Sequence, residues 1–528
     1  MTASTTTDSL APLGPSSGAA TGRASMLGRL DNGPFDLVVA GGGATGLGVA
    51  LDAALRGLKV ALLESHDFAK GTSSRATKLV HGGVRYLAQG RIGLVRESLR
   101  ERSALLHNAP ELVRPLPFVV PAYHFWEIPF YTAGLSLYDV LAGRDGLGAT
   151  HVLSRRQTGK RLPGVCMKGL VGGIEYWDAQ FDDARLAVAL ARAAEAAGAV
   201  VLNYVRVTGL IHERGRVAGV RAQDTETGQD FMLRSPCVVN AAGVWSDALR
   251  RLDAQASDRP VQDLIRTSRG THLVVDRSFF PSDRALLVPR TADGRVLFAV
   301  PWLGKVLLGT TDVATDELTR EPRPDDAEID YILQEAGRYL QVQPARRDIR
   351  SAWAGLRPLV DPAAEGAAAG PVATRSISRE HTVEISAAGL VTVAGGKWTT
   401  YRAMAQDALE ACARAGLLAT LPPCRTQDFV LAAAAGPRAG PAHGAQRGGD
   451  VLGSAGLTPA MIRHAARHEY ARKVEDVLAR RSRLLFLDAA LAARAAPDAA
   501  RILQSETGVD AGLDDFLLLA RRYGLGMV

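Results

Sequence analysis

Cysteine is scarce in this chain of 528 residues. The four cysteines, Cys166, Cys237, Cys412 and Cys424, lie far apart and form no C-x-x-C motif and no Cys/His cluster. This spacing supports neither a disulfide scaffold nor a structural zinc site, so we expect no metal centre. A few scattered cysteines are typical of a protein in a reducing compartment.

Long apolar runs are also lacking. Because no run of about 20 consecutive apolar residues occurs, a membrane-spanning helix is not expected. The first 33 residues are rich in Thr, Ser, Ala and Gly, lack the apolar segment of a signal peptide, and include Asp8, which disfavours a transit peptide. We expect residues 1–33 to form a disordered tail. The hydrophobic content of 47% excludes a disordered chain and is enough for two to four domains.

The charge balance is basic, with 62 Lys and Arg against 55 Asp and Glu, a net charge of +7. Such an excess fits nucleic acid, an acidic membrane surface or an anionic substrate. Residues 75–114 alone contain eight Lys or Arg against three acidic residues. Basic and aromatic residues are not interleaved as in RNA-binding proteins, so we expect no nucleic acid partner and assign the excess mainly to an anionic substrate.

A strand, a helix and a second strand are predicted within the first 65 residues. The β-branched run Phe35–Ala40 stops at a glycine cluster, apolar residues at helical spacing follow over Leu47–Leu55, and Lys59–Glu64 forms a second apolar run. The same alternation recurs, which predicts an α/β architecture. The later elements are a helix over residues 184–197 and strands over residues 200–203, 216–221 and 237–240.

The glycine cluster fits the dinucleotide-binding pattern G-x-G-x-x-G, with a strand before it and a helix after it. Gly41 permits a tight turn, Gly43 lets backbone N–H groups approach a pyrophosphate, and Gly46 lets the helix pack on the strand. The helix N-terminus, opened by Ala44 and Thr45, favours the phosphate charge. A merely glycine-rich loop is the alternative.

Glu64 ends the second strand 21 residues after Gly43. Its carboxylate is placed to accept hydrogen bonds from a ribose hydroxyl, which favours FAD or NAD over NADP. Small residues after the strand 237–240 would let the backbone approach a cofactor again, as in FAD enzymes, although a tight structural turn is the alternative. In those enzymes the strand end near Val207 contacts the adenine. The cofactor contacts expected after residue 240 are Ala241, Ala242, Gly243 and Trp245.

The segment Lys70–Leu87 is unusually rich in hydroxyls, cations and glycines. Thr72, Ser73 and Ser74 can donate to pyrophosphate oxygens, Lys78 adds positive charge, and the turn His81-Gly82-Gly83 lets backbone lie close to a flat ring. The segment resembles the signature of FAD-dependent glycerol-3-phosphate dehydrogenases, the respiratory enzymes that pass electrons to quinone. The resemblance covers roughly residues 34–410, with further matches in Glu101–Pro117, Asp182–Leu186, Pro301–Gly304, Gly309–Asp312, Gly355–Leu359, Ser378–His381 and Gly395–Arg402.

The resemblance implies a Rossmann-type FAD-binding domain interleaved with a mixed-sheet substrate domain, which we place at residues 34–425. Residues 456–526 are rich in Ala, Leu and Arg at helical periodicity, so a C-terminal all-α domain is expected over residues 453–528. A stretch of Ala, Gly and Pro at residues 432–450 predicts a linker between the two, over residues 426–452.

The activity that the resemblance implies is oxidation of sn-glycerol 3-phosphate to dihydroxyacetone phosphate, by hydride transfer to flavin N5, with quinone as the electron acceptor. The guanidinium fork of arginine suits the phosphate. By resemblance, Arg85, Arg357 and Arg379 are substrate contacts, with Tyr86 beside them. Arg357 stands in an otherwise apolar run, where an unpaired guanidinium would be costly to bury.

His272 matches a histidine of the family's active site and is the expected base for the substrate hydroxyl proton, because its ordinary pKa is close to working pH. The alternative is a histidine that only hydrogen-bonds substrate or backbone. His81 is a second candidate that we expect to pack on the flavin instead. His272 is expected just before an apolar strand.

Lys397, Thr399 and Thr400 open a helix predicted to start at Tyr401. Backbone N–H groups there could hold negative charge developing near the flavin N1–C2 carbonyl, and Lys397 is also an expected catalytic and substrate contact. An ordinary helix N-cap is the alternative. Four other polar residues are expected to be structural: Asp182 and Asp183 at a helix start, Asp312 in a turn, and His381.

Seven of the 30 aromatic residues lie between Phe118 and Tyr138. Four prolines in and just before this segment would break a long helix, so it cannot span a bilayer. It could lie at the membrane interface and deliver quinone, which would make the protein cytoplasmic and peripheral on the cytoplasmic face. The alternative is a buried, irregular apolar segment.

Rival functions use the same or a related scaffold. One is an oxidase that returns electrons to oxygen, and another is an amine oxidase of the glycine or sarcosine type. The several arginines favour a phosphate over an amino acid. A rival of another class is a flavin-binding regulatory protein without catalysis. A homodimer stays open as an alternative to a monomer.

Overall fold

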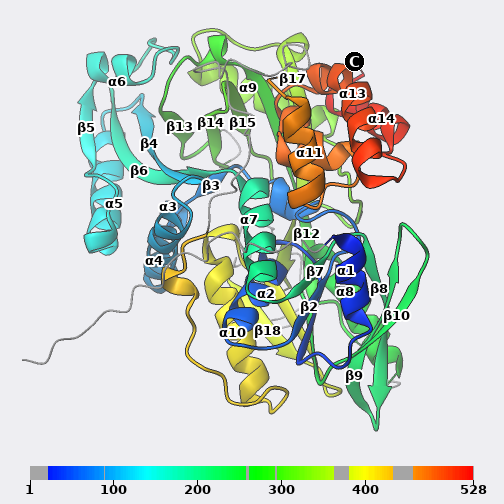
Figure 1. Cartoon of the computed structure of the whole chain (residues 1–528). Coiled ribbons are helices and arrows are strands. Elements are labelled where there is room, and N and C mark those ends of the chain that lie inside the picture. The colour runs from blue at the N-terminus through cyan, green and yellow to red at the C-terminus, as the bar shows by residue number, and fades with distance from the viewer. Residues whose placement is uncertain are drawn as a thin grey trace, which may run out of the picture.

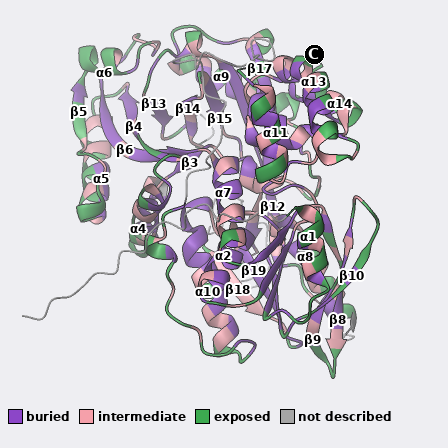
Figure 2. Cartoon of the chain, viewed as in Figure 1, coloured by how far each residue is buried: buried purple, intermediate pink, exposed green. Residues whose placement is uncertain are grey.

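The computed structural model describes residues 22–87, 90–256, 261–291, 294–361, 380–431 and 456–526. Its strands form two large sheets and one small sheet, and helices cover them (Figure 1). The predicted linker stretch 432–450 and Arg379 lie outside the described residues. Figure 2 shows the burial of the strands at the centre, with exposed residues concentrated on outer helices and loops.

The dinucleotide sheet has six strands in the order β18-β19-β11-β1-β2-β7. Its strands pair in parallel except for the edge strand β18. The strands other than the edge strand β18 are almost fully buried, because helices pack on one face of the sheet and a smaller sheet packs on the other. The elements are β1 (Leu37–Ala40), α2 (Ala44–Leu55), β2 (Val60–Leu63), α7 (Asp183–Ala196), β7 (Val200–Leu202), β11 (Cys237–Asn240), α8 (Ser246–Ala256), β18 (His381–Ile385), β19 (Leu390–Gly395) and α10 (Tyr401–Arg414).

The second large sheet has ten strands and is mixed, because β13 and β4 pair in parallel while its other pairs are antiparallel. Its strands come from chain segments on both sides of β11, so the two sheets are interleaved in sequence. The strands are β3 (Leu79–Val80), β4 (Val113–Ala122), β5 (His151–Ser154), β6 (Gly172–Phe181), β12 (Ile265–Asp276), β13 (Ala285–Val288), β14 (Leu297–Trp302), β15 (Lys305–Gly309), β16 (Val313–Ala314) and β17 (Ile349–Val360). The helices beside it are α3 (Val84–Leu87), α4 (Ile92–Asn108), α5 (Glu127–Ala142), α6 (Arg155–Arg161) and α9 (Asp326–Tyr339).

A small antiparallel sheet of β8 (Val205–Glu213), β9 (Arg216–Asp224) and β10 (Asp230–Arg234) packs beside the dinucleotide sheet. The expectation of a disordered tail over residues 1–33 is wrong for its last part, because residues Arg23–Leu30 form helix α1. Its apolar side chains Met26 and Leu30 are buried against these strands. A helix of eight residues is not stable alone, so its formation depends on this packing.

The C-terminal helices are α11 (Pro459–His468), a π-helical segment (Asp476–Arg481), α12 (Leu484–Leu487), α13 (Ala489–Thr507) and α14 (Leu513–Tyr523). They share one apolar core with the large sheet, in which Trp353 of β17 contacts Phe486 of α12. The predicted all-α character of this region, the Rossmann-type sheet and the mixed second sheet are confirmed. The exact domain limits stay a prediction.

The aromatic segment 118–138 consists of the end of β4, a short loop and most of α5, so the alternative of a buried, irregular segment is wrong. Pro129 is the third residue of α5, where its missing N–H has no helical partner to lose. Phe118 and Tyr138 are buried, whereas Phe125, Trp126 and Phe130 are exposed. Among the helices that the structure describes, none is long and apolar enough to cross a bilayer.

Candidate active site

A cavity of about 1480 Å³ lies between the carboxyl ends of the dinucleotide strands and the large sheet. At one end it is lined by the loops that follow β1, β2 and β11, and at the other by residues of β12 and β17 and by the loop after β19. Ligands in α/β folds bind at the carboxyl ends of the strands. The cavity is therefore the candidate site, and its two ends have different chemistry.

The glycines of the first loop leave room for a diphosphate. Gly41 has φ +113°, and a Cβ there would lie 2.5 Å from the carbonyl oxygen of Ala241. A Cβ on Gly46 would lie 1.9 Å from the carbonyl oxygen of Gly41, so the helix can approach the turn only with glycine at this position. At Gly43 only the Ser73 hydroxyl, at 3.1 Å, lies close to such a Cβ. Backbone N–H groups at the α2 N-terminus are thus accessible from the cavity, as a dinucleotide requires.

Glu64 lines the same end of the cavity. One carboxylate oxygen accepts from Gly42 N at 2.7 Å, and the other accepts from His66 N at 2.9 Å and Ser65 Oγ at 3.2 Å. Burial raises the pKa of this carboxyl group. The loop holds the side chain at the edge of β2, where an adenosine ribose can reach it.

Three hydroxyls of the segment 70–87 take different places. Ser73 Oγ accepts a hydrogen bond from Ala44 N at 3.0 Å, at the α2 N-terminus. Thr72 lines the cavity and donates to the carbonyl oxygen of Leu356. Ser74 is fully buried and does not line the cavity. Only Ser73 and Thr72 can therefore contact a cofactor there.

Lys78 does not reach the cavity, contrary to the expected contact with the pyrophosphate. Its ammonium lies 2.7 Å from Asp183 Oδ2 and 4.8 Å from the centre of the Trp353 ring, and it is fully buried. Burial lowers the pKa of Lys78 to about 7, with a further lowering by Arg483 and an opposing contribution from Asp183. The sequence pattern could not reveal this, because Arg483 lies 405 residues further along the chain.

Glycines also shape the other end of the cavity. Gly83 has φ +82°, and a Cβ there would lie 2.3 Å from the Tyr86 ring. Gly82 N donates to Tyr138 Oη at 2.7 Å and so turns away from the cavity, whereas His81 and Gly83 line it. Lys397 donates to Ser98 Oγ at 2.7 Å, and its ammonium lies 4.9 Å from the centre of the Tyr86 ring.

His272 lies inside β12, paired with Trp353 of β17, and not just before a strand as expected. Its ring stacks on Trp353 with centroids 4.3 Å apart, and Nε2 lies 3.0 Å from Thr77 Oγ1. Burial lowers the pKa of His272 well below its ordinary value, and the cations Arg357 and Lys78 lower it further. The imidazole is therefore neutral near pH 7 and able to accept a proton.

Arg357 projects from β17 into the cavity beside His272. Its guanidinium donates to Ser268 Oγ at 3.1 Å, Thr310 Oγ1 at 3.1 Å and Thr311 O at 3.0 Å, and lies 3.6 Å from Asp312. These groups hold the guanidinium in one place. Asp312 lines the cavity and accepts from Ser268, so it does more than form a turn.

The structure brings most of the predicted residues to this one cavity. Those that line it are Gly41, Gly43, Ala44, Thr45, Glu64, Thr72, Ser73, His81, Gly83, Tyr86, Val207, Ala241, Ala242, Gly243, Trp245, His272, Arg357, Lys397 and Thr399. Five predicted residues do not line it: Gly46, Ser74, Lys78, Gly82 and Thr400. Arg379 lies outside the described residues, and the backbone of Arg85 lies in α3.

Other functional candidates were missed by sequence reasoning. Thr77 contacts His272, Ser98 holds Lys397, and Thr310 and Thr311 hold Arg357. The motif Gly309–Asp312 matches the family pattern and could have drawn attention to the two threonines. Nothing in the local sequence distinguishes Thr77 or Ser98 from ordinary polar residues.

Comparison with known proteins agrees with this geometry. Residues 36–402 match the family model described as FAD dependent oxidoreductase, and residues 426–512 match the C-terminal domain of alpha-glycerophosphate oxidase. The mitochondrial glycerol-3-phosphate dehydrogenase of Mus musculus is 44% identical over 74% of this chain and 55% of its own length. The chain thus spans about half the length of this relative.

Two further relatives match over longer stretches. The mitochondrial glycerol-3-phosphate dehydrogenase SDP6 of Arabidopsis thaliana is 39% identical over 90% of this chain and 83% of its own length. The structure of glycerol-3-phosphate dehydrogenase from Bacillus halodurans, complexed with FAD, is 28% identical with a TM-score of 0.73, covering 97% of this chain and 99% of that one. The cavity fits the same cofactor, because it combines a dinucleotide end with a second end long enough for a flat ring. The chain belongs to the family of FAD-dependent oxidoreductases, among the glycerol-3-phosphate dehydrogenases.

Proposed function

We propose that this protein oxidises sn-glycerol 3-phosphate to dihydroxyacetone phosphate. The observation that carries the proposal is a neutral, buried histidine beside the cation Arg357 in a cavity that a second cation, Lys397, also lines. A secondary alcohol next to a dianionic phosphate needs both a base for its hydroxyl proton and cations for its phosphate. His272 supplies the first, and Arg357 and Lys397 supply the second.

The residues act on the substrate as follows. His272 accepts the proton of the C2 hydroxyl, and the C2–O bond becomes a carbonyl as hydride leaves C2. FAD, when bound, supplies the two-electron acceptor for that hydride. Arg357 binds an anionic substrate group through paired N–H donors, and Tyr86 and Lys397 orient the remaining hydroxyl or phosphate oxygens.

The test is anaerobic addition of glycerol 3-phosphate to the purified flavoprotein, with the flavin absorbance near 450 nm recorded. We expect glycerol 3-phosphate to bleach the flavin absorbance, and we expect glycerol and glycine to leave it unchanged. An unchanged spectrum would refute it, and bleaching by glycine alone would favour an amine oxidase.

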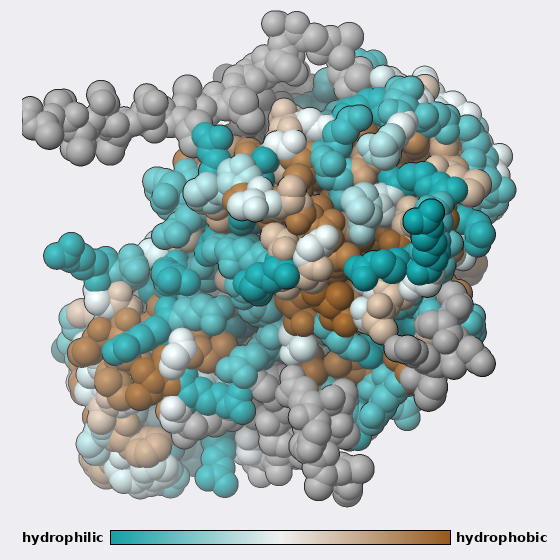
Figure 3. Space-filling view, turned by 90° about the horizontal axis from the view of Figure 1, so that it is seen from below, coloured by the Kyte–Doolittle hydropathy of each residue, from teal (hydrophilic) through white to brown (hydrophobic). Residues whose placement is uncertain are grey.

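We further propose that quinone is the electron acceptor and that α5, together with the loop before it, contacts the membrane. Phe125, Trp126 and Phe130 are 81%, 59% and 63% exposed, and Trp126 and Phe130 also line the cavity. In Figure 3 apolar side chains gather at the left of the view, where α5 lies in Figure 1. Exposed aromatic residues favour the membrane interface, so a lipid-soluble acceptor could enter the cavity there.

Sedimentation with vesicles tests the membrane contact. Replacing Phe125, Trp126 and Phe130 by Ser should reduce vesicle binding and quinone reduction together while leaving anaerobic bleaching intact. The matched control is Met232→Ser, on β10, which removes an apolar side chain that is 60% exposed elsewhere on the surface. Unchanged sedimentation of the triple variant would refute the contact, and faster reoxidation of the reduced flavin by oxygen than by quinone would favour an oxidase.

A further inference from the structure

Two arginines at the Glu64 end of the cavity, Arg206 and Arg320, lie close enough to repel each other. Arg206 lies on β8, and Arg320 lies in the segment between β16 and α9. Both line the cavity, together with Glu64, His66 and Trp245. Within the described part of the chain, neither guanidinium has a hydrogen bond or an ion pair with another residue. By contrast, Arg75, which also lines the cavity, pairs with Glu321 at 2.7 Å.

The positive charge at this end is not neutralised by the protein. Burial lowers the pKa of Arg320, and Arg206 lowers it further, whereas Glu64 opposes the shift. The pKa of the neighbouring His66 falls to about 3, first through burial and then through Arg320, Lys70 and Arg206. Glu64 does not neutralise both arginines. Its carboxylate oxygens already accept hydrogen bonds from Gly42 N and His66 N, and burial raises its pKa and so disfavours its charged form. An anion would relieve the repulsion.

The side chain of Arg320 is held above the cavity wall. Its guanidinium carbon lies 5.4 Å from the centre of the Trp245 ring. Trp245 in turn packs on Gly71, in the loop after β2 that carries Thr72 and Ser73 and is here named the cofactor loop. A Cβ on Gly71 would lie 3.2 Å from the Trp245 ring. Arg320 therefore lies over Trp245 and beside the loop that carries Ser73, whose hydroxyl contacts Ala44 N at the α2 N-terminus, where a diphosphate would lie.

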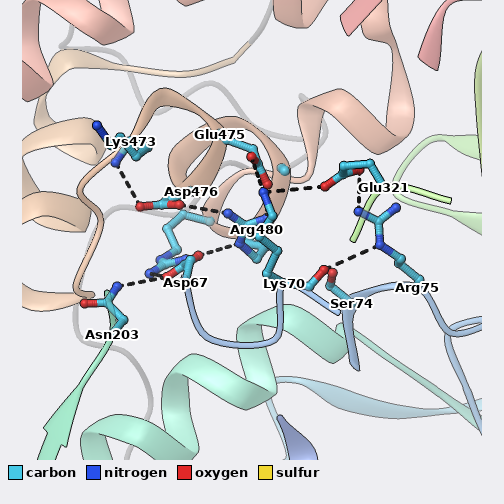
Figure 4. A network of polar contacts seen from close by, with 12 residues as sticks. Asp67, Lys70, Ser74, Arg75, Asn203, Glu321, Lys473, Glu475, Asp476 and Arg480 are labelled. Carbon is cyan, nitrogen blue, oxygen red and sulfur yellow. Dashed lines mark hydrogen bonds and ion pairs between the residues drawn. The ribbon is translucent and has the colours of Figure 1, made fainter. Parts of the chain in front are cut away.

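The residue next to Arg320 fixes its segment to the rest of the molecule. Glu321 accepts from Arg75 at 2.7 Å and from the Tyr523 hydroxyl at 3.2 Å, and lies 3.5 Å from Lys70. Lys70 also pairs with Glu475 of the C-terminal region at 2.6 Å. Figure 4 shows this network, in which Glu321, Lys70 and Glu475 join three segments that are far apart in sequence.

We propose that Arg320, together with Arg206, binds the diphosphate of FAD, and that Glu321 positions Arg320 by tying its segment to the cofactor loop and the C-terminal helices. The guanidinium forks match phosphate oxygens, and the diphosphate supplies the negative charge that this end of the cavity lacks. The C-terminal helices then contribute to cofactor retention through Glu475 and Tyr523, although neither residue lines the cavity.

The test measures cofactor affinity and needs no substrate. Full-length protein freed of flavin is titrated with FAD and, separately, with riboflavin, and flavin fluorescence is followed. Arg320→Met should raise the Kd for FAD roughly tenfold to a hundredfold, as expected for a lost charge-assisted hydrogen bond, and should leave riboflavin binding unchanged. Arg206→Met should act in the same direction.

The matched control is Arg323→Met, three residues further along the same segment, on an exposed side chain that does not line the cavity. It should leave both affinities within about twofold of wild type. Equal weakening of FAD and riboflavin by Arg320→Met, or an FAD Kd within twofold of wild type, would overturn the phosphate contact.

The positioning role is tested in the same titration with Glu321→Gln. This variant should weaken FAD binding less than Arg320→Met does, and the double variant should be no weaker than Arg320→Met alone, because both changes act through one contact. Additive losses in the double variant, or no loss from Glu321→Gln, would overturn the positioning role of Glu321.

Discussion

His272 gives the sharpest prediction, because its surroundings keep its imidazole neutral and it lines the cavity as the proposed base. The side chain is 2% exposed, stacks on Trp353 and lies near two cations, Arg357 and Lys78, so its pKa is well below the ordinary value of 6.5. A general base positioned by a protein contributes roughly 10²–10⁴-fold to the rate. His272→Asn should therefore slow flavin reduction by glycerol 3-phosphate by about that factor.

The assay is anaerobic stopped-flow reduction of the flavin at saturating substrate. A control variant, Thr77→Val, removes only the hydroxyl 3.0 Å from His272 Nε2 and should slow reduction about threefold to tenfold. FAD content and the thermal midpoint of both variants should match those of wild type. A His272→Asn rate within fivefold of wild type would refute the assignment of the base.

The pH dependence provides an independent check. A histidine with an ordinary pKa would be half protonated at pH 6.5 and would lose activity below about pH 7. Because the pKa of His272 is lowered, the acid limb of kcat/KM should fall below pH 6.5 and should be absent in His272→Asn. Arg357→Met removes a neighbouring cation and should move that limb to higher pH. An acid limb at or above pH 7 in wild type that persists in His272→Asn would contradict this reasoning.

Three further predictions concern binding and stability. Arg357→Met should raise the KM for glycerol 3-phosphate roughly tenfold to a hundredfold in steady-state kinetics, because the cation that Ser268, Thr310 and Thr311 hold in place for an anionic group is lost, and Arg357→Lys should restore only part of the affinity. Asp67→Asn should lower the free energy of unfolding by about 3–5 kcal/mol in denaturant titration, because a fully buried carboxylate between Arg480 and Arg481 is neutralised, whereas Asp498→Asn in an exposed pair with Arg501 should cost less than about 0.5 kcal/mol. Gly46→Ala should abolish FAD retention and lower the thermal midpoint, because its Cβ would lie 1.9 Å from the Gly41 carbonyl oxygen, whereas Gly93→Ala has open space and should be tolerated.

The dinucleotide half of the fold was predictable because its determinants are local. The spacing from Gly41 to Gly46 is set by one turn and one helix N-terminus, and Glu64 directly follows β2 because an α/β unit repeats on that length scale. The same locality explains why the predicted strand 237–240 coincides with β11. Hydrophobic periodicity likewise predicted the C-terminal helices.

Other features depend on contacts between distant segments. Lys78 looked like a phosphate ligand beside three hydroxyls, yet its ammonium pairs with Asp183. Arg483, from the C-terminal region, donates to the carbonyl oxygen of Ser74 and to the same Asp183. Helix α1 forms on a surface supplied by β8 to β10, which no local pattern encodes. Pro129 suggested a break, but a proline in the first turn of a helix costs no hydrogen bond.

The distribution of charge explains what the net charge of the sequence could not. Buried arginines such as Arg102, Arg480 and Arg483 pair with buried acidic residues and so contribute little to the field outside the molecule. Among the described residues that line the cavity, nine are Lys or Arg and three are Asp or Glu, an excess of six against a net charge of +7 for the whole chain. Since a cleft concentrates the field of its charges, this excess acts where a diphosphate and a phosphorylated alcohol would enter. We therefore expect the cations of the cavity to bind two anions at once, with Arg206 and Arg320 at the cofactor end and Arg357 and Lys397 at the substrate end.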